Sequence, residues 1–445
     1  MNSLTPTLHL TPRRAALRTG VPNEVDLLVR IEAPARPVEA GASRPALNLA
    51  LVIDRSGSMS GPPLREAKRC AEWVVDRLGS QDRAAVVAYD HAVDIAVPSR
   101  DVRDRAGFCR AIASIHEGGM TNLHGGWLAG ADQVATRSEN GALSRVILLS
   151  DGCANRGETD PHTITEQARA LAAEGVTTST YGLGSHFNEL LMTAMAEAGG
   201  GSAYYGDRAE DLFEPFEQEL DLLASTCGRR VTLRVAGLTG AEWQLLNDYP
   251  EAGPGLSGVW RLPDLAYEAE VWALLRLTVP ASQGTLVDLL EVQAEYTDLD
   301  GRRCDLSAGR LSLPVVPADI WEACAEDETV ARRADELAAA ALQSRARAAA
   351  LDGDWDQVDR LLGDARRVGQ RSPWASEIVT ELQGLAAARD QLRFSKEAHF
   401  SERRMRYQAR SPRFDSLSPL HDADAPSYLR RKSRQGRRSG REGKR

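Results

Sequence analysis

The stretch that decides the fold is Leu51-Val52-Ile53-Asp54-Arg55-Ser56-Gly57-Ser58-Met59-Ser60-Gly61, where an apolar run ends in an acid, hydroxyls and glycines. Residues 47–53 are almost continuously hydrophobic, which predicts a strand buried on both faces of a parallel sheet. Ligands of open α/β sheets bind beyond the carboxyl ends of such strands. Asp54, Ser56 and Ser58 form a D-x-S-x-S set there and offer hard oxygen ligands to a small dication such as Mg²⁺. The alternative is that Asp54 only caps the following helix.

Two later segments add polar side chains of the same kind. Gly118-Gly119-Met120-Thr121-Asn122-Leu123 places a threonine in a glycine-bounded loop, and Val146-Ile147-Leu148-Leu149-Ser150-Asp151-Gly152 places an aspartate at another strand end. We expect both side chains to lie in loops at the crevice of the sheet, outside the core.

This set of residues resembles the metal-ion-dependent adhesion site of von Willebrand factor type A domains, and the resemblance covers about residues 45–224. It implies a bacterial intracellular type of domain that binds Mg²⁺ or Mn²⁺ and acts on a protein partner. In that family the two aspartates often act through water, and a Glu or Asp of the partner completes the coordination. The implied metal ligands are Asp54, Ser56, Ser58, Thr121 and Asp151.

The pattern around the motif predicts an α/β fold. Strand-like segments separated by helices of about ten to fifteen residues indicate a doubly wound, mostly parallel sheet covered on both faces. Residues 84–89 and 93–97 are close enough in sequence for a hairpin only, which predicts one antiparallel edge strand. We assign residues 45–227 to this domain.

The chain after Cys227 changes character. Residues 228–317 contain short strands without intervening helices, which predicts an antiparallel β-sandwich. Residues 1–44 hold two strand-like runs that we expect to join this sandwich, with the metal domain inserted between, because isolated strands are marginally stable. Residues 318–407 show helical spacing of apolar residues, and Gly353-Asp354 interrupts them. We expect a helical hairpin followed by a third helix from about Pro373.

The last segment, residues 408–445, is expected to be a disordered basic tail. Residues 428–445 carry nine Lys or Arg against the single Glu442, although the whole chain has a net charge of −9. Such a tail suits an anionic partner such as nucleic acid, an anionic membrane or an acidic protein, and it could equally be a solvated end.

Enzymatic interpretations fit the same residues poorly. A phosphatase of the haloacid dehalogenase type needs a second aspartate where Ser56 stands, and the sequence around Ser58 lacks the glycines of a hydrolase elbow. Neither an export signal nor an apolar run long enough for a membrane span is evident, so we expect a cytoplasmic protein. The main hypothesis is a non-enzymatic, Mg²⁺-dependent protein-interaction module. The alternatives are a metal-dependent phosphatase or hydrolase, and a nucleic-acid-binding protein that uses the basic tail.

Overall fold

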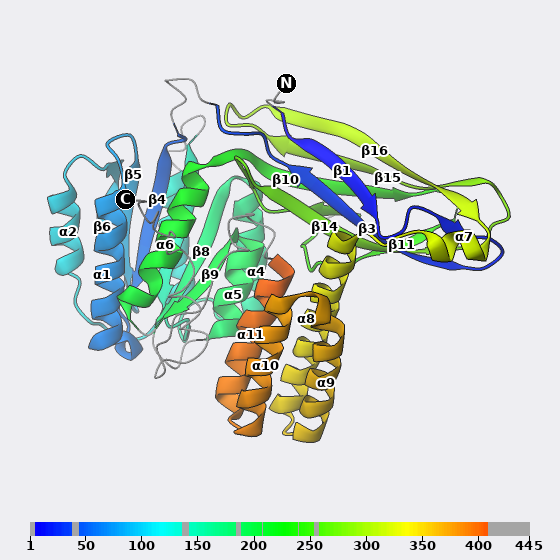
Figure 1. Ribbon diagram of the computed structural model, residues 1–445. Coiled ribbons are helices and arrows are strands. Elements are labelled where there is room, and N and C mark those ends of the chain that lie inside the picture. The colour runs from blue at the N-terminus through cyan, green and yellow to red at the C-terminus, as the bar shows by residue number, and fades with distance from the viewer. Residues whose placement is uncertain are drawn as a thin grey trace, which may run out of the picture. The chain divides into compact units, whose positions relative to one another are not determined.

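The computed structural model describes residues 5–37, 44–135, 142–183, 188–206, 208–238, 240–252 and 258–407 (Figure 1). These residues fall into two compact units. The first lies within residues 44–226. The second combines residues 5–37 with the described residues after Thr226, apart from the turn at residues 298–302. No helix in the described ranges is both long and apolar enough to cross a membrane.

The first unit contains a six-stranded mixed sheet in the order β6-β5-β4-β7-β8-β9. All neighbouring strands are parallel except β6, which runs antiparallel to β5 at one edge and so confirms the expected edge hairpin. Every residue of the central strand β4 is buried, as its unbroken apolar sequence predicted. The strands are β4 (Leu47–Asp54), β5 (Arg83–Tyr89), β6 (Val93–Asp101), β7 (Leu143–Ser150), β8 (Val176–Leu183) and β9 (Gly200–Gly206).

Helices cover both faces of this sheet (Figure 1). Leu51 and Ile53 of β4 face one apolar core, which is shared with α1, α2 and α6. Helices α3, α4 and α5 cover the opposite face, where a Cβ on Gly130 of α3 would lie 2.3 Å from Val52, so only glycine allows this close packing. The helices are α1 (Pro62–Arg77), α2 (Arg105–Ala113), α3 (Leu123–Ala135), α4 (Pro161–Ala173), α5 (Glu189–Ala198) and α6 (Ala209–Ala224).

The second unit contains two sheets that enclose an apolar core. One sheet has the order β1-β3-β14-β11, so β3 pairs directly with a strand from beyond Cys227 and β1 pairs with β3, as expected of the N-terminal strands. The other has the order β12-β10-β15-β16-β2, with β13 beside β10. The pairs β12-β10, β10-β15 and β15-β16 are antiparallel. The two-residue β2 runs parallel to β16, which corrects the expectation of a wholly antiparallel sandwich.

The strands of the first of these sheets are β1 (Thr7–Pro12), β3 (Asn23–Glu32), β11 (Glu242–Leu245) and β14 (Glu270–Val279). Those of the second are β2 (Leu17–Arg18), β10 (Thr226–Gly237), β12 (Val259–Arg261), β13 (Leu265–Ala266), β15 (Leu286–Thr297) and β16 (Arg303–Val316).

The helical part of the second unit begins with the short α7 (Ala318–Ala323) and continues through α8 (Glu328–Leu351), α9 (Trp355–Val368), α10 (Pro373–Ala387) and α11 (Gln391–Tyr407). Asp354 caps α9, as its position after Gly353 predicted. The helix expected from about Pro373 is confirmed as α10, and the chain then turns into a further helix, α11, which the sequence did not predict. Arg389 has a φ of +51°, and Asp390 accepts a hydrogen bond from the main chain of Arg393 at 3.1 Å.

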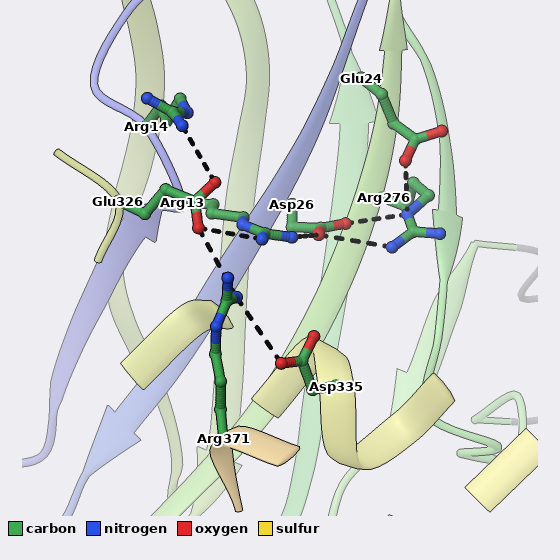
Figure 2. Close-up of polar contacts among 8 residues, drawn as sticks. All are labelled: Arg13, Arg14, Glu24, Asp26, Arg276, Glu326, Asp335 and Arg371. Carbon is green, nitrogen blue, oxygen red and sulfur yellow. Dashed lines mark hydrogen bonds and ion pairs between the residues drawn. The ribbon is translucent and has the colours of Figure 1, made fainter. Parts of the chain in front are cut away.

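Helix α8 packs on the four-stranded sheet of the same unit through apolar residues, among them Trp272 and Leu337. Eight charged residues, which we call the charged hub, link these two parts (Figure 2). At its centre Asp26 is only 5% exposed and accepts a hydrogen bond from Arg276 at 2.8 Å. The hub consists of Arg13, Arg14, Glu24, Asp26, Arg276, Glu326, Asp335 and Arg371. The expected basic tail, residues 408–445, lies outside the described residues.

Candidate metal centre

Asp54 is the last residue of β4 and is completely buried. Its Oδ1 accepts a hydrogen bond from the main-chain N–H of Ser56 at 2.9 Å. Its Oδ2 accepts hydrogen bonds from the Ser150 hydroxyl at 2.6 Å and from the Tyr89 hydroxyl at 3.1 Å. Because Tyr89 and Ser150 end the two strands that flank β4, three neighbouring strand ends fix the orientation of one carboxylate.

The charge state of Asp54 reflects its burial. Burial raises the pKa of Asp54 to about 6, although hydrogen bonds from Ser150 and Ser56 act in the opposite direction, and the negative charge of Asp151 raises it further. Two carboxylates therefore lie close enough to repel each other. A bound dication would offset both charges and lower the pKa of Asp54 again.

Ser56 and Ser58 lie at the start of the loop that follows β4, and a short 3₁₀ turn, η1 (Gly57–Met59), shapes that loop. Ser56 is buried and Ser58 is exposed. Their hydroxyl oxygens are 3.2 Å apart. Two oxygens bound to Mg²⁺ at adjacent corners of an octahedron would be about 2.9 Å apart, so this pair needs little movement to share one ion.

The loop that carries Thr121 is tied to the loop after β4. Gly118 donates to the carbonyl of Arg55, and Gly57 donates to the carbonyl of Gly119, both at 2.7 Å. Asp90 supports the same loop by accepting a hydrogen bond from the main chain of Gly119 at 3.1 Å. A Cβ on Gly118 would lie 1.9 Å from Asp90 Oδ2, so this approach requires glycine.

Asp151 follows β7 directly, and its loop is shaped by its own side chain. Oδ1 of Asp151 accepts a hydrogen bond from the main chain of Cys153 at 3.1 Å, and its carbonyl accepts one from Asn188 at 2.7 Å. Thr121 and Asp151 are 2% and 7% exposed, so the expectation that they lie outside the core is wrong with respect to burial. Both residues lie in loops and are nevertheless buried.

Sequence reasoning missed four residues that hold this arrangement together, one of which is Tyr89, whose hydroxyl donates to Asp54. Asp90 directly follows β5, and Ser150 is the last residue of β7. Both could have been predicted from the sequence, because polar residues at the carboxyl ends of parallel strands often belong to a binding site. Asn155 accepts a hydrogen bond through its side-chain Oδ1 from the main-chain N–H of Thr121, a contact between distant loops that no sequence pattern indicates.

The donor set suits a small, hard cation. The three predicted segments meet at one edge of the sheet and provide three hydroxyls and two carboxylates, which are the oxygen ligands that Mg²⁺ takes. Both polar main-chain groups of Thr121 are hydrogen-bonded, whereas within the described ranges its hydroxyl makes no hydrogen bond. Among the described side chains, no group of three or more His, Cys, Asp or Glu could hold a metal ion. The role of the five residues as metal ligands stays a prediction.

Comparisons with known proteins agree with this fold. Residues 48–218 match the family model of the von Willebrand factor type A domain. An uncharacterized protein of Synechocystis sp. is 33% identical over 172 residues, which cover 39% of this chain and 40% of that relative. The chain spans about two fifths of the length of the first curated relatives that it matches.

Two solved structures share the fold over most of the chain. A von Willebrand factor type A protein from Catenulispora acidiphila has a TM-score of 0.67 at 21% identity and covers 86% of this chain and 91% of its own. The ArnB paralog VWA2 from Sulfolobus acidocaldarius has a TM-score of 0.60 at 19% identity, with 91% and 98% covered. At these identities the likeness shows the fold alone. Together with the family match, it supports a von Willebrand factor type A domain over residues 48–218.

Proposed function

We propose that this protein binds a protein partner through a divalent ion, Mg²⁺ or Mn²⁺, held by the five residues of the candidate metal centre. The observation that carries this proposal is the meeting of the three loops. Hydrogen bonds of Gly57 and Gly118 join the loop after β4 to the Thr121 loop, and hydrogen bonds of Asn155 join the Asp151 loop to Thr121. Domains of this family commonly bind protein partners, and the hydroxyls and carboxylates here match the ligand chemistry of the ion.

The bound ion would supply an open coordination position with excess positive charge, because hydroxyl ligands are neutral. A Glu or Asp side chain of the partner is the natural group for that position. The chain's own residues prepare the site: Ser150 and Tyr89 orient Asp54, and Asp90 holds the loop that carries Thr121. The proposal is therefore a binding site in a cytoplasmic protein, with no nucleophile and base pair assigned to it.

Peptide display tests the chemistry of the partner directly. Peptides selected on the protein in Mg²⁺ should share an acidic residue, release on chelation, and fail to bind after Glu→Gln or Asp→Asn exchange in the peptide. The Asp54→Ala variant should retain none of them. Selection of peptides that bind equally well in chelator would reject metal-mediated recognition.

The alternative of a metal-dependent phosphatase or hydrolase predicts turnover at the same residues. Incubation with generic phosphate and ester substrates in Mg²⁺ separates the two functions. Turnover that disappears in Asp54→Ala would replace the binding proposal, whereas background rates in both proteins agree with it.

A further inference from the structure

Asn155 forms hydrogen bonds with both the N–H and the carbonyl of Thr121. The N–H of Thr121 donates to Oδ1 of Asn155 at 2.8 Å, and the N–H of Asn155 donates back to the carbonyl of Thr121 at 3.1 Å. The N–H of Arg156 donates to the same carbonyl, also at 3.1 Å. One loop thus satisfies every polar main-chain group of Thr121 and leaves its hydroxyl available for another partner.

The same two loops also meet at a second point. Gly157 has a φ of +71°, and a Cβ there would lie 2.4 Å from Oδ1 of Asn122. Asn122 follows Thr121 directly and in turn accepts a hydrogen bond from Gly125 at the start of α3. The loop after Asp151 therefore contacts the Thr121 loop both at Thr121 and at the next residue, Asn122.

The contact between Asn155 and Thr121 affects the spacing of two predicted metal ligands. Asp151 and Asn155 belong to one short loop, so the hydrogen bonds of Asn155 set the position of Thr121 relative to Asp151. Metal ligands must be held within about 0.5 Å of their working positions by residues that do not touch the ion. Loss of such supporting contacts costs about 10- to 100-fold in metal affinity in other sites.

We propose that Asn155 is a positioning residue that places the Thr121 hydroxyl for metal binding without contacting the ion. This inference rests on the proposed function, because it assumes that Thr121 is a ligand. It predicts that a residue exposed on the surface controls metal affinity through two main-chain hydrogen bonds.

The test is a calorimetric titration of the chelator-treated, full-length protein with Mn²⁺. Asn155→Ala should bind Mn²⁺ about 10- to 100-fold more weakly than the wild type. Asn155→Asp keeps the acceptor for the Thr121 N–H and should bind at least nearly as tightly as the wild type. The matched control is Asp160→Ala, which removes an exposed side chain that accepts from Thr163 at 2.9 Å and caps α4. The control should leave Mn²⁺ affinity unchanged.

A double variant separates positioning from general stability. If Asn155 acts through Thr121, adding Asn155→Ala to Thr121→Val should cause little further loss of affinity. A merely structural role would instead lower the melting temperature in chelator and leave Mn²⁺ affinity unchanged. If Asn155→Ala does not fold, Asn155→Leu takes its place, because leucine is close in shape to asparagine but has no hydrogen-bond acceptor. Its Mn²⁺ affinity and its melting temperature in chelator are then compared with those of the wild type.

The outcomes distinguish the two proposals. Tight Mn²⁺ binding by the wild type together with equal binding by Asn155→Ala and Asn155→Leu would overturn the role of Asn155 and leave the metal site intact. A wild-type protein that binds no Mn²⁺ would overturn both.

Discussion

Ser150, the last residue of β7, donates a 2.6 Å hydrogen bond from its hydroxyl to Oδ2 of Asp54, the last residue of β4. The same hydroxyl accepts a hydrogen bond from the main chain of Gly152 at 2.8 Å. Ser150 therefore joins the first predicted ligand, Asp54, to the loop of the last one, Asp151. Ser150 itself is completely buried.

Ser150→Ala should weaken both the fold and the metal site. Removing a donor to a buried carboxylate should lower the free energy of unfolding by about 1–3 kcal/mol, measured by urea denaturation in chelator. Mn²⁺ affinity should fall as well, because Asp54 loses one of its orienting contacts. Thr180→Val is the control: it removes a buried hydroxyl that donates to the carbonyl of Met192 at 2.8 Å, and should leave Mn²⁺ affinity unchanged. Equal affinities in wild type and Ser150→Ala would contradict this role.

The raised pKa of Asp54, about 6, predicts two opposite responses to pH. The metal-free folded protein binds a proton at Asp54 more readily than the unfolded chain, so the contribution of Asp54 to stability declines as pH rises from about 4 to 6. The loss is on the order of 3 kcal/mol. Mn²⁺ must displace this proton, so its affinity should fall about tenfold per pH unit below 6.

Asp54→Asn isolates this effect from the other titrating groups. In chelator, the variant should gain stability relative to the wild type as pH increases from 4 to 7, as followed by urea denaturation. Parallel pH profiles for the two proteins would show that Asp54 ionises with an ordinary pKa.

The charged hub of the second unit provides a prediction outside the metal site (Figure 2). Asp26→Asn should lower the free energy of unfolding by about 1–3 kcal/mol, because it removes the negative charge and one of the two acceptor oxygens at a nearly buried position. Glu295→Gln is the matched control, since Glu295 pairs with Arg303 at the surface. There the cost should be about 0–1 kcal/mol. A loss for Asp26→Asn no larger than for Glu295→Gln would mean that the hub does not stabilise this unit.

The sequence predicted the features that short patterns encode. The unbroken apolar run before Asp54 indicated a strand buried on both faces, and the short gap after Tyr89 indicated the antiparallel edge. Ser150 and Asn155 were missed because their roles arise from contacts between strands and loops that lie apart in sequence. The break between α10 and α11 depends on the left-handed conformation of Arg389, a residue type that gives no local signal for it. The two-residue strand β2 is too short to show alternation.

The central claim is that the five residues hold one divalent ion, and a titration of the metal-free protein with Mg²⁺ and Mn²⁺ tests it most directly. The wild type should bind one ion per chain, and its melting temperature should rise with the logarithm of the ion concentration above the Kd. Ca²⁺, which needs more ligands, should bind more weakly. Thr121→Val, which keeps the side-chain volume but removes the hydroxyl, should reduce the affinity by at least about tenfold. Absence of binding by the wild type, or equal binding by Thr121→Val, would contradict the claim.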